Sequence, residues 1–168
     1  MRESILNGKK ILAVDDEPDV LAVLEEEILE ACPASQFDKA SQFEVAYEKL
    51  NSQTYDLVLL DIMGVRGFDL LSLAVSRNVT VAMITAHALF PQALKRSIEI
   101  GARAYLPKEK IGEVVPFLED ILKYGFLPGW ERLFQNLEEF FNTRWGKDWW
   151  VPEEKFYKKI WTNASRNR

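Results

Sequence analysis

A chain of 168 residues suits one domain of ordinary size with a short additional segment. Its 48% hydrophobic and 28% charged residues are typical of a globular protein and exclude a disordered one. The net charge of -5 argues against nucleic acid as the main partner, because phosphate binding needs a basic surface. Cys32 is the only cysteine, so an internal disulfide is excluded and we expect a reducing compartment.

Neither the amino terminus nor any internal segment has the pattern of a targeting or membrane-spanning sequence. Residues 1–10 lack the apolar core of a secretion signal. The longest apolar stretch, residues 79–90, is interrupted by Thr and His and is too short to span a bilayer. We therefore expect a soluble, cytoplasmic protein without membrane contact.

Short apolar runs alternate with longer amphipathic segments along the first 125 residues. The run "YDLVLLD", residues 55–61, is continuous and ends in an acid, which is typical of a strand buried on both faces. Pro18 suits the first turn of a helix. Five rounds of strand and helix predict an α/β fold, a parallel sheet with helices on both faces. We expect strands at 10–14, 37–40, 55–61, 79–85 and 103–106, and helices at about 18–31, 42–50, 68–77, 91–100 and 113–124.

Polar residues at the ends of these strands are expected to share one edge of the sheet. In such sheets the ligand binds outside the carboxyl ends of the strands, where the strand order reverses. The residues concerned are Asp15 and Asp16 after the first strand, Asp61 at the end of the third, Thr85 at the end of the fourth and Lys108 after the fifth.

Three carboxylates in one small cleft need a compensating charge, because otherwise their pKa values rise until one is protonated. A hard cation with oxygen ligands, such as Mg²⁺, supplies that charge. Lys108 can reach a phosphoryl group held nearby, and Thr85 offers a hydroxyl donor. One aspartate could then attack phosphorus and form an aspartyl phosphate. The residues therefore predict phosphoryl transfer, which needs mainly positioning and charge neutralisation.

Four motifs, "VDDE", "LVLLDIMG", "MITA" and "YLPK", resemble in order and spacing the receiver domain of two-component response regulators. The resemblance covers about residues 8–125. It implies a five-stranded doubly wound parallel sheet of the flavodoxin-like kind. It also implies a response regulator that accepts a phosphoryl group from a sensor histidine kinase or phosphotransfer protein and switches a surface for a downstream protein. No enzymatic activity is expected beyond the chain's own autophosphorylation and autodephosphorylation.

The resemblance assigns roles to the acidic residues. Asp61 corresponds to the phosphorylated aspartate. Asp15, Asp16 and Asp61 correspond to the ligands of Mg²⁺, with the backbone carbonyl of Met63 as a further ligand. Taken singly, Asp16 could be only a helix-capping acid and Asp61 only an acid that ends a strand, and these common structural roles are then the favoured explanation. The four motifs together favour the phosphorylation site.

The remaining motif residues correspond to the phosphate-binding and switch positions of the family. Lys108 and Ala86 are expected to bind phosphate, and Thr85 and Tyr105 to form the switch pair. Tyr105 could instead be an ordinary surface aromatic residue. His87 and Met63 occupy positions at which the family tunes loss of the phosphoryl group, although His87 could also be an exposed loop histidine.

Two departures from the family pattern concern the loops. Glu109 follows Lys108 where the family usually has a proline joined through a cis peptide bond. A cis bond before a non-proline residue costs about 2.5–4 kcal/mol, so we expect a trans bond, or a strained cis one. Gly64 replaces the proline that often follows the phosphorylated aspartate. Both changes concern the output loops and leave the expected nucleophile and metal ligands in place.

The residues leave three rival functions to weigh. A DNA-binding effector is disfavoured, because the last 40 residues are too short and too weakly basic for a usual output domain. A catalytic output domain is disfavoured, because those residues lack a nucleophile with its base and a metal cluster. A phosphomonoester hydrolase that forms an aspartyl phosphate on a related sheet is the more serious alternative, which turnover of a phosphomonoester would distinguish.

The carboxyl-terminal residues differ in composition from the rest and carry all five tryptophans. A boundary at residues 125–130, where Gly and Pro break the helical pattern, is expected to separate a receiver domain, 1–125, from a helical extension, 126–168. Gly146 is expected to end its first helix, and Pro152 to open a short last one. The apolar positions of the first helix form one stripe: Trp130, Leu133, Phe134, Leu137, Phe140, Phe141 and Trp145. This stripe either folds back on the receiver or forms a homodimer or partner surface, and the sequence leaves both open.

Overall fold

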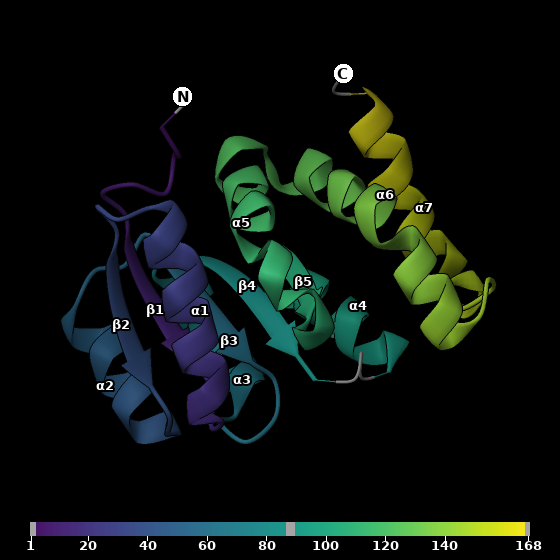
Figure 1. The fold of residues 1–168 in the computed structure, drawn as a ribbon. Coiled ribbons are helices and arrows are strands. Elements are labelled where there is room, and N and C mark those ends of the chain that lie inside the picture. Colours follow the sequence, from purple (N-terminus) through teal and green to yellow (C-terminus); the bar gives the residue numbers. More distant parts are fainter. Residues whose placement is uncertain (1–2, 87–89, 167–168) are drawn as a thin grey trace.

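The computed structural model describes residues 3–86 and 90–166, with side chains described as far as Trp161. In this part of the chain, five parallel strands form one sheet in the order β2-β1-β3-β4-β5 (Figure 1). This order confirms the predicted doubly wound sheet. The strands are β1 (Lys10–Val14), β2 (Gln36–Ala40), β3 (Leu57–Asp61), β4 (Thr80–Thr85) and β5 (Ala104–Pro107).

Helices cover both faces of the sheet. One face carries α1 next to α5, and the other carries α2, α3 and α4 in a row. Every helix and strand predicted in the first 125 residues is present, with ends that differ by at most two residues. The helix expected at 113–124 is preceded by a turn of 3-10 helix, η1. The helices are α1 (Pro18–Ala31), α2 (Phe43–Ser52), α3 (Gly67–Ser76), α4 (Pro91–Ile100), η1 (Lys108–Glu113) and α5 (Val114–Lys123).

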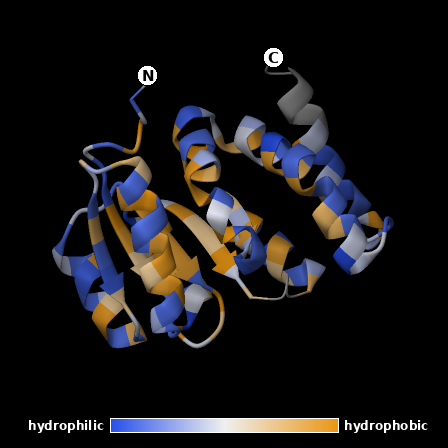
Figure 2. Ribbon diagram, viewed as in Figure 1, coloured by the Kyte–Doolittle hydropathy of each residue, from blue (hydrophilic) through white to orange (hydrophobic). Residues whose placement is uncertain are grey.

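The sheet forms the hydrophobic core and brings its strand ends together. All residues of β3 are buried, as expected for a strand with helices on both sides. The four strands other than β2 are mostly hydrophobic, whereas the edge strand β2 is largely hydrophilic and the helices carry both kinds of residue (Figure 2). In the register of the ladders, Val14 lies beside Leu60 and Asp61 beside Ile84. The residues that follow Val14 therefore lie next to Asp61.

Two further helices follow α5, namely α6 (Phe126–Trp145) and α7 (Glu154–Arg166), joined through the short η2 (Val151–Glu153). The predicted break of the helical pattern at residues 125–130 is wrong beyond Gly125, because Pro128 lies in the first turn of α6. The first four backbone N–H groups of a helix have no intrahelical acceptor, so a proline is tolerated there. Within the described part of the chain, each helix is too short or too polar to cross a membrane.

Helices α6 and α7 fold back onto the β5 side of the sheet (Figure 1). Trp130 of α6 is fully buried, and its indole N–H donates to the carbonyl of Ala102 at 3.0 Å. Helix α6 packs against α5 and β5, and α7 packs against α6. Lys95 of α4 pairs with Glu153 at 2.9 Å, which ties the segment before α7 to the sheet domain. Of the two arrangements left open for the aromatic stripe, the structure shows the fold-back.

Candidate functional site

Three carboxylates gather at the carboxyl edge of the sheet. Asp15 and Asp16 follow β1, and Asp61 ends the neighbouring β3. One carboxylate oxygen from each lies within 4.8 Å of the other two. Asp15 and Asp61 are buried, whereas Asp16 is exposed. The backbone N–H of Glu17 donates to Asp15 at 2.9 Å and fixes the orientation of that carboxylate. The sequence predicted this cluster, and the structure brings all three residues together.

Lys108 is the cation that the fold brings to this cluster. Its Nζ lies 2.9 Å from Asp15 and 3.5 Å from Asp61. A longer contact of 3.6 Å joins it to the exposed Glu17. The lysine side chain is only 12% exposed, so its charge is screened little by water. One ammonium group therefore links the ends of β1, β3 and β5.

Burial and mutual repulsion shift the ionisation of the site. The pKa of Asp61 is raised to about 7, first by burial and then by the charge of Asp15, although Lys108 opposes the shift. Burial also raises the pKa of Asp15, against the hydrogen bond from Lys108. Burial lowers the pKa of Lys108, but its contacts with Asp15 and Asp61 outweigh this and leave it raised. The cluster therefore carries more negative charge than one lysine balances.

The residues present fit a magnesium ion. The donor set consists of carboxylate oxygens, which are the ligands that hard divalent cations prefer. The three oxygens are close enough to one another to share one ion. Burial and, after it, the charge of Asp15 raise the pKa of Asp61 and so disfavour its ionised form, which a bound cation would stabilise. Asp15, Asp16 and Asp61 are thus a suitable partial ligand set for Mg²⁺.

Two glycines shape the loop that follows Asp61. Gly64 has a φ of +83°, and a Cβ built there would lie 2.2 Å from the carboxylate of Asp16. A Cβ at Gly67 would lie 2.0 Å from the carbonyl oxygen of Asp61. Larger side chains at either position would displace a residue of the cluster. In the sequence, Gly64 stands out only as the replacement of a proline, and no pattern indicates the close approach at Gly67.

The residues around the fourth strand are placed only in part. Thr85 is buried at the end of β4, and its hydroxyl donates to the carbonyl of Ala86 at 3.3 Å. Ala86 is partly exposed beside it. His87 lies outside the described residues. Met63 follows Asp61 closely and exposes 63% of its surface, so its side chain takes no part in the buried cluster.

Tyr105 and Glu109 connect the site to the carboxyl-terminal helices. Tyr105 is completely buried, so the reading of it as a surface aromatic residue is wrong. Its ring lies 6.4 Å from that of Phe141 of α6. Glu109 accepts a hydrogen bond from Arg144 of α6 at 2.9 Å. Cis peptide bonds are absent among the described residues, so the bond between Lys108 and Glu109 is trans, as expected.

Residues 11–115 match the family described as the response regulator receiver domain. The chain is 35% identical over 105 residues to a two-component response regulator of Arabidopsis thaliana, covering 60% of this chain and 16% of that protein. It is 32% identical over 109 residues to a gliding motility regulatory protein of Myxococcus xanthus, covering 61% of this chain and 14% of that protein. The chain thus corresponds to a small part of each relative.

Solved structures share the sheet and its helices. The response regulator protein TrrA of Thermotoga maritima, solved in complex with Mg²⁺-BeF, matches with a TM-score of 0.58 and 30% identity, over 67% of this chain and 98% of that one. A CheY-like receiver domain protein of Methanospirillum hungatei matches with a TM-score of 0.58 and 22% identity, over 70% of this chain and 98% of that one. With the acidic cluster, the strand order and the match over residues 11–115 in agreement, the chain belongs to the response regulator receiver domain family.

Proposed function

We propose that this receiver domain accepts a phosphoryl group on Asp61. The observation that carries the proposal is the placement of Asp61, which ends the buried β3 among two other carboxylates and within 3.5 Å of Lys108. Aspartate is a nucleophile in its ionised form, and a nearby ammonium group can hold the phosphoryl oxygens in reach. The match to the receiver domain family and the similarity to a two-component response regulator of Arabidopsis thaliana favour this function over the hydrolase alternative.

In the proposed reaction a carboxylate oxygen of Asp61 forms a bond to phosphorus while the bond from phosphorus to the donor breaks. Asp15, Asp16, Asp61 and the backbone carbonyl of Met63 would hold Mg²⁺. When bound, Mg²⁺ would neutralise the charge of the phosphoryl oxygens. Lys108 would move from its contact with Asp61 to a phosphoryl oxygen, and Thr85 would donate its hydroxyl to another. Support comes from the similar TrrA protein, which was solved with Mg²⁺-BeF.

Labelling with a small phosphodonor tests this assignment. Incubation with acetyl phosphate and Mg²⁺ should add one phosphoryl group to the chain, measured by intact-protein mass spectrometry. Asp61→Asn should abolish the addition, because the amide is a far weaker nucleophile. The exposed carboxylate of Asp56 provides a matched control, and Asp56→Asn should be labelled like the parent protein. Equal labelling of Asp61→Asn and the parent would refute the role of Asp61.

For the output we propose that residues 1–125 form the receiver and residues 126–168 an extension that reads its state. Tyr105 lies in β5 and touches Phe141 of α6. Phosphorylation would draw Thr85 toward the phosphoryl group and bias the position of Tyr105 and of the helix that covers it. Because such a change is a population shift, the extension would exist in held and loosened states beforehand.

Hydrogen exchange tests this coupling. Addition of acetyl phosphate and Mg²⁺ should change the exchange of backbone amides in α6, which packs on β5, by a factor of at least about three. Asp61→Asn treated in the same way is the control and should show no change. Unaltered exchange in α6 of a chain that mass spectrometry shows to be phosphorylated would refute the coupling and leave the phosphorylation proposal intact.

The partners are proposed from the family and from the residues. A sensor histidine kinase or a phosphotransfer protein would supply the phosphoryl group, and a downstream protein would bind the face that the extension uncovers. A homodimer formed through the same face is a further form of output, whereas direct DNA binding is not proposed. The buried, free thiol of Cys32 suits a reducing compartment, and we propose a cytoplasmic location.

A further inference from the structure

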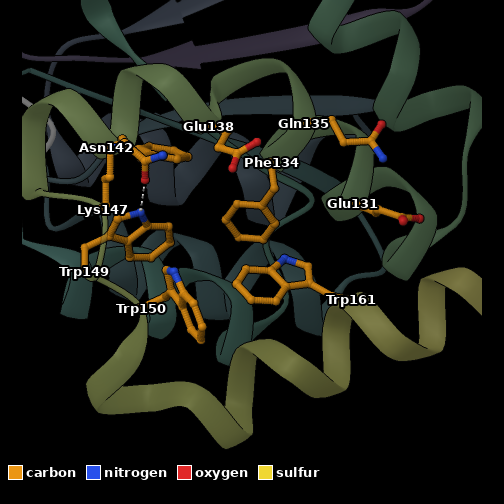
Figure 3. A pocket seen from close by; sticks show the side chains of 10 residues that line it. Glu131, Phe134, Gln135, Glu138, Asn142, Lys147, Trp149, Trp150 and Trp161 are labelled. Atoms are coloured by element: carbon orange, nitrogen blue, oxygen red, sulfur yellow. Dashed lines mark hydrogen bonds between the residues drawn. The ribbon is translucent and has the colours of Figure 1, made fainter.

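A cavity of about 380 Å³ lies between α6 and the segment that leads into α7, away from the acidic cluster. Its size falls in the range of pockets that hold small molecules. Figure 3 shows the rings of Phe134, Trp149, Trp150 and Trp161 gathered around one space. The proposed phosphorylation chemistry uses none of these side chains.

The ring of Trp161 stands at a steep angle to two of the other rings of the cavity. The rings of Phe134 and Trp161 lie 6.1 Å apart at 87°, and those of Trp150 and Trp161 lie 5.2 Å apart at 77°. Trp149, Trp150 and Trp161 are each partly exposed. The indole N–H of Trp149 donates to Asn142 at 3.2 Å, so that polar group is already satisfied. A ligand in the cavity would therefore meet ring faces and edges from several sides.

The rim of the cavity is acidic. Glu131 and Glu138 line it from α6, and Lys147 is the basic residue among its lining side chains. Glu138 is exposed at the mouth of the cavity. Glu139 follows Glu138 and lines a shallower hollow beside the cavity. An anionic ligand would meet repulsion at this rim, whereas a cationic ligand would be attracted.

We propose that this cavity binds a small organic cation, with an alkylated ammonium centre against the aromatic rings and an apolar body between α6 and α7. Ring faces attract a cation through their quadrupole, most strongly in tryptophan, and a substituted ammonium loses little hydration on entering. Inorganic cations are not expected, since Mg²⁺ and Ca²⁺ need several oxygen ligands in a closed shell. The acidic rim adds long-range attraction and separates this site from a purely apolar one.

Binding of benzyltrimethylammonium to the full, unphosphorylated chain tests the proposal. Titration followed by tryptophan fluorescence and by calorimetry should show saturable binding at one site. Neopentylbenzene, its neutral carbon isostere of the same shape, should bind at least about fivefold more weakly, because it lacks the cation–π attraction. Equal binding of the two compounds, or binding of neither, would overturn the proposal. In particular, equal binding would mark the cavity as an apolar gap in the packing.

Matched variants localise the effect. Glu138→Gln should weaken binding of the cation about threefold, whereas Glu139→Gln, the same change one residue outside the cavity, should alter it by less than about 1.5-fold. Trp150→Leu should weaken binding of the cation more than binding of the isostere. Trp150→Phe should restore part of the preference for the cation over the isostere. Circular dichroism checks that each variant is folded. Equal effects of the two glutamate variants, or an unchanged preference in folded Trp150→Leu, would overturn the assignment to this cavity.

Discussion

The carboxyl edge of the sheet and the face under α6 are built from opposite kinds of side chain. At the edge, Asp15 and Asp61 are buried with their charges close together, and the pKa of Asp61 is raised to about 7. Under α6, Trp130 and Phe141 are buried among apolar neighbours. Burial therefore destabilises the ionised carboxylates at the edge of the sheet, whereas it stabilises the packing of the aromatic residues under α6. The comparison separates the residues kept for chemistry from those that hold the helices in place.

A single strand joins these two regions. Tyr105 lies in β5 under α6, and Lys108 follows the end of the same strand at the acidic cluster. Glu109, the next residue, is bound by Arg144 from the last turn of α6. A shift at Lys108 would therefore reach the extension in two ways. One is the buried contact of Tyr105 with Phe141, and the other is the ion pair of Glu109 with Arg144.

The largest effect on stability is expected from Trp130→Ala. The substitution removes a fully buried indole and leaves the carbonyl of Ala102 without its 3.0 Å hydrogen bond. Unfolding in urea should show a loss of about 3–5 kcal/mol in the free energy of unfolding. Mg²⁺ affinity, measured by calorimetry on the folded variant, should stay within about twofold of the parent.

Val151→Ala is the control for this substitution, because Val151 lies in the same extension but is 44% exposed. It should cost less than about 1 kcal/mol. A Trp130→Ala variant as stable as Val151→Ala would show that the extension is not anchored through the buried indole. A large loss of Mg²⁺ affinity would show that the two regions are not independent.

Gly64→Ala should damage the acidic cluster. At a φ of +83° an alanine costs about 1–2 kcal/mol, and its Cβ would meet the carboxylate of Asp16 at 2.2 Å. Mg²⁺ affinity, measured by calorimetry, should fall about tenfold or more because Asp16 must move. Gly8→Ala is a matched control with a φ of +78° and nothing within 4 Å of its Cβ. It should lose similar stability but bind Mg²⁺ normally, and equal Mg²⁺ affinities in the two variants would contradict the prediction.

The two regions also differ in how much of them could be predicted from the sequence. The positions of the acids at the strand ends can be predicted, because a buried apolar run that stops at Asp61 indicates both the strand and the edge of the sheet at which the acid lies. The parallel register then brings Asp15 beside it without knowledge of any side-chain contact. The shape of the loop after Asp61 cannot be predicted in this way, since Gly64 comes close to Asp16 only when the chain is folded.

For the extension, the sequence predicted the helix and its apolar stripe but not the surface that it covers. An apolar stripe indicates only that one face of a helix is buried. The receiver and a second protein could cover that face equally well. The acceptor of the Trp130 indole is a backbone carbonyl 28 residues earlier, which no local pattern specifies. In the sequence, Pro128 indicates a break of the helical pattern. Its tolerated position within the first turn of α6 depends on where the helix begins, which the sequence does not show.

A smaller effect is expected from Asp61→Asn when Mg²⁺ is removed with EDTA. A raised pKa means that the native state binds more protons than the unfolded one, so the stability of the parent falls as pH rises from about 4 to about 7. The amide carries no charge and avoids this loss. At about pH 8 the variant should be more stable by about 1–2 kcal/mol in urea unfolding.

The control for Asp61→Asn is the pH itself. The difference in the free energy of unfolding between variant and parent should narrow at about pH 5. It should also narrow when Mg²⁺ is added to the parent, because the cation stabilises the ionised carboxylate that burial and the charge of Asp15 disfavour. A stability difference that is independent of pH would show that ionisation of the buried Asp61 is not its cause.

The smallest effect concerns the contact between Arg144 and Glu109, which bridges the two regions. Both side chains are 40% exposed, and an ion pair at that exposure contributes about 0.2–1 kcal/mol. A double-mutant cycle with Arg144→Gln and Glu109→Gln should give a coupling energy in that range, which should fall at about 1 M salt. The pair formed by Lys39 of β2 and Glu25 of α1 provides the control, since it touches neither region. With acetyl phosphate and Mg²⁺ present, the Arg144–Glu109 coupling should change while the control coupling stays constant. Coupling energies that are unaffected by phosphorylation in both pairs would show that Glu109 does not pass the state of the acidic edge to α6.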